Sequence, residues 1–121
     1  SERVRQYSEF KQIFLEHPLL GVGPGAYTLA LSKINPVANA YELQPVHNIY
    51  LLILAEWGIV GFLFFVLLYC QIVKLLWRKN RMFLPIILVL LVAGLFDHWN
   101  YTLYSGMMLW WVIWGLGLQK N

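Results

Sequence analysis

Few side chains in this sequence could take part in proton transfer, and His47 stands out among them. An imidazole can take or give a proton near neutral pH, so it suits general acid–base catalysis. His47 precedes a long apolar stretch, which would place a titratable group at the mouth of a membrane bundle. Ionisable residues in that setting are functional candidates. A histidine at a helix start can also simply bond a backbone carbonyl, so spacing alone leaves both interpretations open.

Two other groups of residues could do chemistry, but each has a simpler structural explanation. Asp97 and His98 have the types of a metal-binding or acid–base pair, although polar residues between two membrane spans usually just meet water. Gly21, Gly23 and Gly25 could present backbone N–H groups to a phosphate as a nest. A glycine-rich turn more often only permits sharp bends.

The composition is that of a membrane protein. Of the 121 residues, 60% are hydrophobic and 12% are charged, whereas soluble domains average about 25% charged residues. The net charge of +3 is small and unevenly placed, so it does not indicate nucleic-acid binding. The single cysteine, Cys70, lies in an apolar run, where we expect it to pack as a small core residue rather than form a disulfide. Because the chain begins at Ser1 and reads as mid-protein, we expect a C-terminal fragment of a larger membrane domain.

Three apolar stretches after residue 57 predict three transmembrane helices, at about residues 58–77, 82–99 and 104–118. The third is short, but local thinning of the bilayer can absorb such a mismatch. Basic residues cluster from Lys74 to Arg81 and recur at Lys120, and the positive-inside rule therefore places these segments in the cytoplasm. Residues 1–57 and the loop 97–104 are then extracytoplasmic.

Residues 1–57 contain no run long enough to cross a bilayer and predict an external loop with short helices. An amphipathic helix is expected from Arg3 to Glu16, with Tyr7, Phe10 and Phe14 as its apolar stripe. It should end at His17-Pro18, because a residue before proline is pushed out of the helical region. A turn-rich loop and a short helix over residues 26–34 follow. The predicted fold class is therefore all-α, a fragment of a polytopic helical membrane protein.

A further helix is expected to open at residues 45–47 and to continue into the first span. At 100° per residue, the positions within about 60° of His47 include Gly58 and Gly61. Two glycines below His47 would let another helix approach closely. Glu56 falls on the opposite face, so a continuous helix could not pair it with His47.

Three motifs in residues 1–61 resemble those of the O-antigen ligase and polymerase family. Ser1-x-Arg3-x-x-x-Tyr7 is similar to the family's first motif, and residues 17–27, HPLLGVGPGAY, resemble its glycine-rich loop. The family's signature is similar to His47-Asn48 followed after nine residues by Gly58 and after two more by Gly61. Glu56 also stands at a position that the family has. Residues 62–121 agree only in being late membrane spans.

The resemblance implies a glycosyltransferase of the GT-C type in the bacterial inner membrane, with its active site on the periplasmic side and no metal or cofactor. His47 matches the family's essential histidine, the base that would take the proton of the acceptor hydroxyl. Arg3 matches an arginine that would hold the pyrophosphate of an undecaprenyl-pyrophosphate-linked glycan, since a guanidinium offers bidentate donors. Arg5 lies about 200° from Arg3 around a helix, so both are not expected to face one phosphate.

The acceptor stays open at this stage. A ligase would use lipid A-core, a polymerase a second lipid-linked repeat, and a protein O-oligosaccharyltransferase a protein. A transporter or flippase of lipid-linked glycan is the alternative from another class, because it also needs basic groups for pyrophosphate but needs no base. The expected partners are the glycan donor, its acceptor and the bilayer, without nucleic acid, and the fragment by itself is expected to be inactive.

Overall fold

The computed structural model describes residues 2–119, and within them it is all-helical, with 73% helix and no strand. The all-α expectation is therefore confirmed. The elements are α1 (Glu2–Glu16), α2 (Tyr27–Ile34), α3 (Ile49–Lys79), the 3₁₀ turn η1 (Arg81–Phe83), α4 (Leu84–Ala93), α5 (Trp99–Thr102) and α6 (Tyr104–Leu118).

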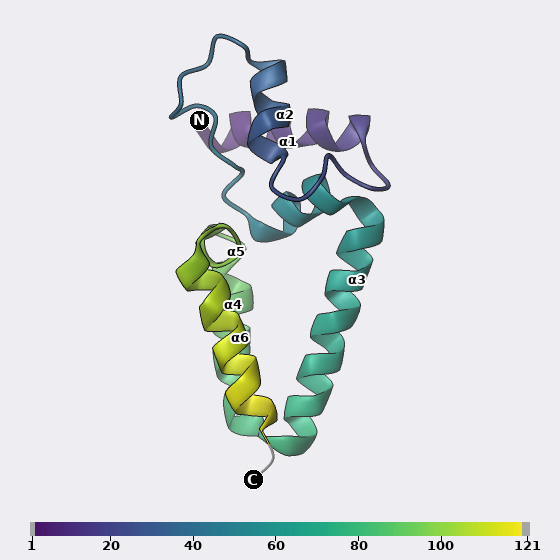
Figure 1. The fold of residues 1–121 in the computed structure, drawn as a ribbon, viewed down its shortest axis with the longest axis vertical. Coiled ribbons are helices and arrows are strands. Elements are labelled where there is room, and N and C mark those ends of the chain that lie inside the picture. The colour runs from purple at the N-terminus through teal and green to yellow at the C-terminus, as the bar shows by residue number, and fades with distance from the viewer. Residues whose placement is uncertain (1, 120–121) are drawn as a thin grey trace.

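Figure 1 shows that the two ends of the molecule are built from different elements. Helices α1 and α2 lie together at one end, above the start of α3. Helix α3 then runs to the opposite end, where the chain turns through η1 into α4, and α6 returns toward that turn. Basic residues Lys74, Arg78, Lys79 and Arg81 therefore gather at the end remote from α1 and α2.

The two short helices near the N-terminus form where the sequence predicts them, but α1 buries a different face. It ends at Glu16, directly before His17-Pro18. Its buried residues are Gln6, Glu9 and Ile13, whereas Tyr7 is 49% exposed and Phe10 and Phe14 are half-buried. The buried polar side chains are accommodated because Gln6 and Glu9 accept hydrogen bonds from His47 and Asn35. The buried Ile13 and these polar contacts thus orient the helix, with Phe10 packed beside them.

Helix α3 is broken at Gly58, and the break is filled by the glycine-rich loop. Gly58 has φ +66°, a left-handed conformation that favours glycine. The break leaves the carbonyls of residues 55 and 56 and the N–H groups of residues 59 and 60 without their usual helical partners. Val22 and Gly23 donate to the Ala55 and Glu56 carbonyls at 3.0 and 2.9 Å, and the Ile59 and Val60 N–H groups donate to the Pro18 and Leu19 carbonyls at 2.9 and 3.2 Å. We call this four-bond junction the splice.

The predicted close approach of another helix is wrong at Gly58 and stays a prediction at Gly61. A Cβ built on Gly58 would collide with the Leu19 carbonyl, so this glycine admits the loop and not a helix. A Cβ on Gly61 would meet the side chain of Trp57 from its own helix. The expected continuous face below His47 also does not exist, because α3 begins only at Ile49 and changes direction at Gly58.

The three predicted membrane spans are not confirmed. Helix α3 is long and apolar enough to cross a membrane, with a mean hydropathy of 2.5 over its most apolar stretch. Helix α4 ends at Ala93, well before the predicted residue 99, because the chain turns at residues 94–98. Helix α6 has the predicted bounds but only 15 residues, short of the roughly 20 that cross a bilayer core.

Two hydrophobic clusters hold these elements together. The upper cluster joins α1, α2 and the start of α3 through Ile13, Tyr27, Leu31, Val46, Leu52 and Ala55. The lower cluster joins α3, α4 and α6, and Tyr69 there packs edge-on against Trp110 and Trp114, each with ring centroids 5.2 Å apart. Cys70 is exposed, contrary to expectation, because it lies on the side of α3 away from this cluster.

Candidate active site

The start of α3 is tied to the end of α4, and this junction positions His47. Asn48 caps α3, because its side-chain oxygen accepts the N–H groups of Tyr50 and Leu51 at 3.0 and 3.1 Å. Its amide nitrogen donates to the Leu95 carbonyl at 3.2 Å, and the Ile49 N–H donates to the Gly94 carbonyl at 2.8 Å. The His-Asn pair is thereby fixed against the turn that carries Asp97.

His47 lies next to Asp97 and His98. Nδ1 of His47 is 3.3 Å from Oδ1 of Asp97, and the two imidazole rings stack with centroids 5.1 Å apart. The side chains of His47 and Asp97 are 38% and 48% exposed, so small ligands can reach them from solvent. With Nδ1–H donating to the carboxylate, Nε2 of His47 carries the lone pair that a general base needs.

The electrostatics of this cluster keep Asp97 ionised and disfavour a charge on His98. Partial burial works to raise the pKa of the Asp97 carboxyl, but hydrogen bonds from the His98 N–H and the His47 ring hold it below its usual value. Asp97 is thus a carboxylate near neutral pH. Burial, partly offset by Asp97, lowers the pKa of His98. The cluster therefore pairs a carboxylate with a His98 ring that resists protonation.

Helix α1 brings Arg3 to the same end of the molecule. Oε1 of Gln6 accepts the backbone N–H of His47 at 3.4 Å, so α1 crosses directly at the candidate base. Arg3 is exposed and lies one helical turn before Gln6 on the same face. Within residues 2–119 it forms no ion pair, whereas Arg5 lies 3.8 Å from Glu9 and 3.7 Å from Glu42. Of the two arginines, Arg3 is the one available to a ligand.

Glu56 faces away from this cluster into a separate buried network. Its carboxylate accepts the Tyr101 hydroxyl at 2.9 Å and the Tyr27 N–H at 3.4 Å, and the Trp57 indole donates to the Tyr101 oxygen at 2.8 Å. Burial raises the pKa of Tyr101, and the Glu56 charge adds to that effect. Glu56 therefore joins α2, α3 and α5 and does not contact His47.

Two of the three glycines of the loop, Gly21 and Gly23, form a structural junction. Gly21 (φ +71°) lies so close to residues 56 and 57 that a Cβ would collide with the Glu56 backbone, and Gly23 donates its N–H to the Glu56 carbonyl. Gly25, with φ +70°, has open space around it. Because the splice engages the N–H groups of Val22 and Gly23, these groups are not directed at a phosphate.

His47, Asp97 and His98 could also hold a divalent metal ion. Each offers one ligand atom, and these atoms all lie within 4.8 Å of one another. Two imidazoles and one carboxylate are a common donor set for zinc and iron. The same atoms can serve as a base with its orienting carboxylate, so the geometry allows either chemistry.

Sequence reasoning placed Asp97 on the same side of the membrane as His47 but missed their direct contact, and it missed the role of Gln6. Asp97 and His98 stand out by type, but fifty positions separate Asp97 from His47, and only the early end of α4 brings them together. Gln6 gives no signal in the sequence beyond its place one turn after Arg3.

Comparison with known proteins identifies the family. No curated protein and no solved structure matches the chain. The sequence model of the O-antigen ligase family matches residues 1–66, which is 66 of the 121 residues and includes α1, the glycine-rich loop, His47 and the splice. Over more than half of its length, with His47 and the splice inside the matched part, the chain belongs to the O-antigen ligase family, a family of glycosyltransferase-like ligases.

Proposed function

We propose that this chain carries the periplasmic active site of a bacterial membrane glycosyltransferase that transfers a glycan from undecaprenyl pyrophosphate to an acceptor hydroxyl, with lipid A-core as the acceptor. Family membership supports an O-antigen ligase or polymerase type of activity. The observation that carries the assignment of the base is the contact between His47 Nδ1 and Asp97 at 3.3 Å, which leaves Nε2 free.

In this proposal His47 is the general base. The acceptor oxygen bonds to the anomeric carbon of the glycan while its proton passes to Nε2 of His47. The bond from that carbon to the pyrophosphate oxygen breaks, and its electron pair leaves with undecaprenyl pyrophosphate. Asp97 positions the ring and stabilises the imidazolium, as a carboxylate can do without itself taking the proton.

Arg3 would bind the pyrophosphate of the donor. Negative charge grows on the leaving pyrophosphate, and a guanidinium that never deprotonates can bind two of its oxygens at once. The arrangement that supports this role is the exposed Arg3 side chain one turn from Gln6, which itself contacts His47. The remaining motif residues would hold the framework and take no part in the chemistry. They are Asn48, Glu56, Gly21, Gly23, Gly25, Gly58 and Gly61.

The proposed topology places residues 1–57 on the periplasmic side and three membrane helices in residues 58–121. Its support is the separation in Figure 1 between the end that carries α1 and α2 and the end that carries the basic segment. Positive charges at the remote end favour the cytoplasmic side.

The decisive experiment is glycan transfer in vitro by the purified protein as the cell makes it. His47→Ala should lower the rate by about 10² to 10⁴, the usual contribution of a general base, while donor binding persists. Transfer at the parental rate would reject His47 as the base. Donor movement across vesicles without transfer would instead indicate a transporter, which needs no base.

Two further arms refine the assignment. Offering lipid A-core or a second lipid-linked repeat as acceptor separates a ligase from a polymerase. Adding a chelator should leave the rate unchanged if the reaction is metal-independent as proposed. A loss of activity that Zn²⁺ or Mn²⁺ restores would assign His47, Asp97 and His98 to a metal ion instead.

A further inference from the structure

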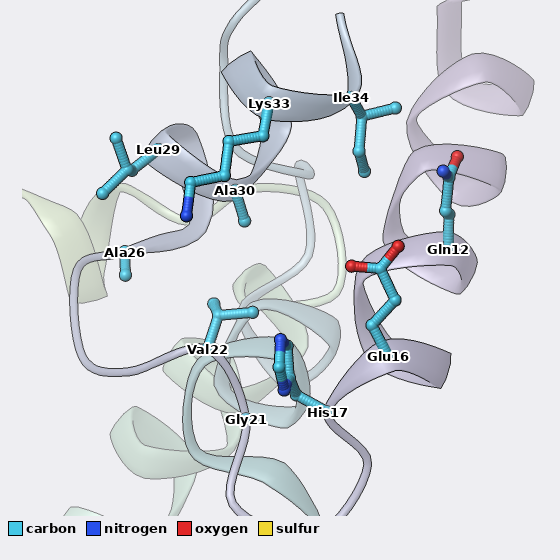
Figure 2. Close-up of a pocket in the computed structure, with 10 residues that line it drawn as sticks. All are labelled: Gln12, Glu16, His17, Gly21, Val22, Ala26, Leu29, Ala30, Lys33 and Ile34. Carbon is cyan, nitrogen blue, oxygen red and sulfur yellow. The ribbon is translucent and has the colours of Figure 1, made fainter.

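A second polar cleft opens between α1 and α2, away from His47. Its volume is about 480 Å³, within the range of about 300 to 1,000 Å³ that is usual for ligand sites. Figure 2 shows the Glu16 carboxylate and the His17 ring pointing from the end of α1 into the space beside α2. The side chains that matter here are Gln12, Glu16, His17, Val22, Leu29 and Lys33.

The polar groups of this cleft are balanced in charge and free to bind. Glu16 and Lys33 carry opposite charges, and the Gln12 amide and the His17 ring add further hydrogen-bonding groups. Within residues 2–119, these four side chains form neither ion pairs with one another nor hydrogen bonds to other residues. Val22 and Leu29 add an apolar wall.

This mixture favours a ligand without net charge. A phosphate would face the Glu16 carboxylate, and a cation would face the Lys33 ammonium. A neutral polyhydroxyl compound offers hydroxyl groups that donate to Glu16 and accept from Lys33, so both charges are satisfied without a net charge on the ligand. Sugars have this character.

The position of the cleft relates it to the candidate base. Gln6 contacts His47, and Gln12 and Glu16 lie six and ten residues further along the same helix. At 1.5 Å per residue, they are about 9 and 15 Å along the axis from Gln6. A chain of several sugars that begins at His47 could therefore extend along α1 to reach the cleft. The loop that forms its floor is fixed by the splice, so the cleft is preformed.

We propose that the cleft between α1 and α2 binds sugar residues of the glycan remote from the reacting bond. This inference rests on the proposed function, since it takes its ligand from the same reaction. Glu16 and Lys33 supply charge-assisted hydrogen bonds to hydroxyl groups, and Leu29 and Val22 cover the apolar face of a ring.

The test measures binding of lipid-free oligosaccharides to the protein as the cell makes it, by ligand-observed NMR titration. One arm uses fragments of the source cell's own surface polysaccharide, the chemistry of the donor. The other arm uses its core oligosaccharide, the chemistry of the acceptor. Saturable binding in either arm supports the cleft and tells which glycan it holds.

The variants locate that binding. Glu16→Ala and Lys33→Ala should each raise Kd about tenfold, the effect of one charge-assisted hydrogen bond. Leu29→Trp, which fills the cleft without changing its charge, should do the same. Lys11→Ala, an exposed lysine of α1 outside the cleft, is the matched control and should leave Kd unchanged.

Failure of this inference is distinguishable from failure of the proposed function. His47→Ala should lose transfer yet keep oligosaccharide binding, because the two sites are separate. Absence of binding in both arms, or equal Kd values for the Leu29→Trp, Lys33→Ala and parental proteins, would overturn the cleft as a glycan site. Either result leaves the assignment of His47 as base untouched.

Discussion

At the scale of single residues, the candidate site depends on which groups carry charge. Asp97 accepts hydrogen bonds from the His98 N–H at 2.6 Å and from the His47 ring at 3.3 Å, so one carboxylate holds both histidines in place. His98 also bonds the Thr102 hydroxyl at 2.8 Å. The orientation of His47, which precedes α3, is therefore fixed from the α4–α5 turn.

His98 should titrate below its ordinary value of 6.5, because burial disfavours the charged ring. The direction in which stability changes with pH follows because the pKa of His98 is lower in the folded than in the unfolded protein. The contribution of His98 to folding stability is fully present above pH 6.5 and is lost as the pH falls through the lower folded value. An NMR titration of the ring protons checks the pKa, and His98→Gln should remove this pH dependence of stability. A midpoint at or above 6.5 would contradict the prediction.

Arg3→Lys should weaken use of the donor by about 1 to 3 kcal/mol, because lysine keeps the charge but loses the bidentate fork. The measurement is kcat/KM for the lipid-linked donor. Arg5→Lys serves as the control, since Arg5 is engaged with Glu9 and Glu42 and should affect donor use little. Equal losses in both variants would mean that the arginines act only through the overall charge of α1.

At the scale of elements, the splice is the backbone junction between the glycine-rich loop and α3. It joins a loop at residues 18–23 to the break in α3 by four backbone hydrogen bonds, and Gly21 and Gly58 make room for the contact from opposite sides. The same break lets α3 begin near α1 and still continue toward the opposite end of the molecule.

Gly58→Ala and Gly21→Ala should each destabilise the protein strongly. A left-handed alanine costs about 1 to 2 kcal/mol by itself, and the collisions with Leu19 and Glu56 add to that. Gly25→Ala is the matched control, because Gly25 also has a positive φ but has open space around it. This variant should be destabilised only by the cost of the left-handed conformation. Thermal unfolding in detergent, followed by loss of soluble protein, measures the difference. If all three variants behaved alike, the collisions would be unimportant.

The helices of the N-terminal part could be predicted from sequence because their signals are local. Pro18 lies just after the end of α1, and Asn35-Pro36 follows α2. Hydrophobic periodicity indicates the helices themselves. The break at Gly58 could not be predicted, since residues 49–79 read as one apolar helix and a glycine there is compatible with either conformation. Its φ is set by contact with Leu19, about forty positions away. The pairing of His47 with Asp97 is equally non-local, and it needs α4 to end at Ala93.

At the scale of the whole molecule, α3 connects two clusters with different surroundings. The upper one packs under α1 and α2 and is bordered by the candidate site, whereas the lower one consists of α3, α4 and α6 with many exposed apolar side chains around it, among them Phe64, Trp111 and Leu88. Exposed apolar surface on this scale suits contact with lipid or other membrane helices.

The proposed topology predicts opposite results for two fusions. A reporter active only in the periplasm should be silent at Asn80, in the basic turn, and active at Val37, which is 96% exposed near α2. The charge distribution is the physical reason, because basic loops stay in the cytoplasm. Strong activity at Asn80 would place His47 on the cytoplasmic side and remove it from the proposed chemistry. Comparable protein levels of the two fusions are the required control.

The splice also restricts where the chain can change in length. Its four hydrogen bonds pair residues 18, 19, 22 and 23 with residues 59, 60, 55 and 56, so one inserted residue inside either segment would put every partner out of register. The stretch from residue 36 to 44 has no such partner in α3, and Val37 and Tyr41 point into solvent. Deletions and insertions should therefore accumulate between α2 and Pro45 during divergence of this family, while the intervals 17–27 and 47–61 keep a constant number of residues.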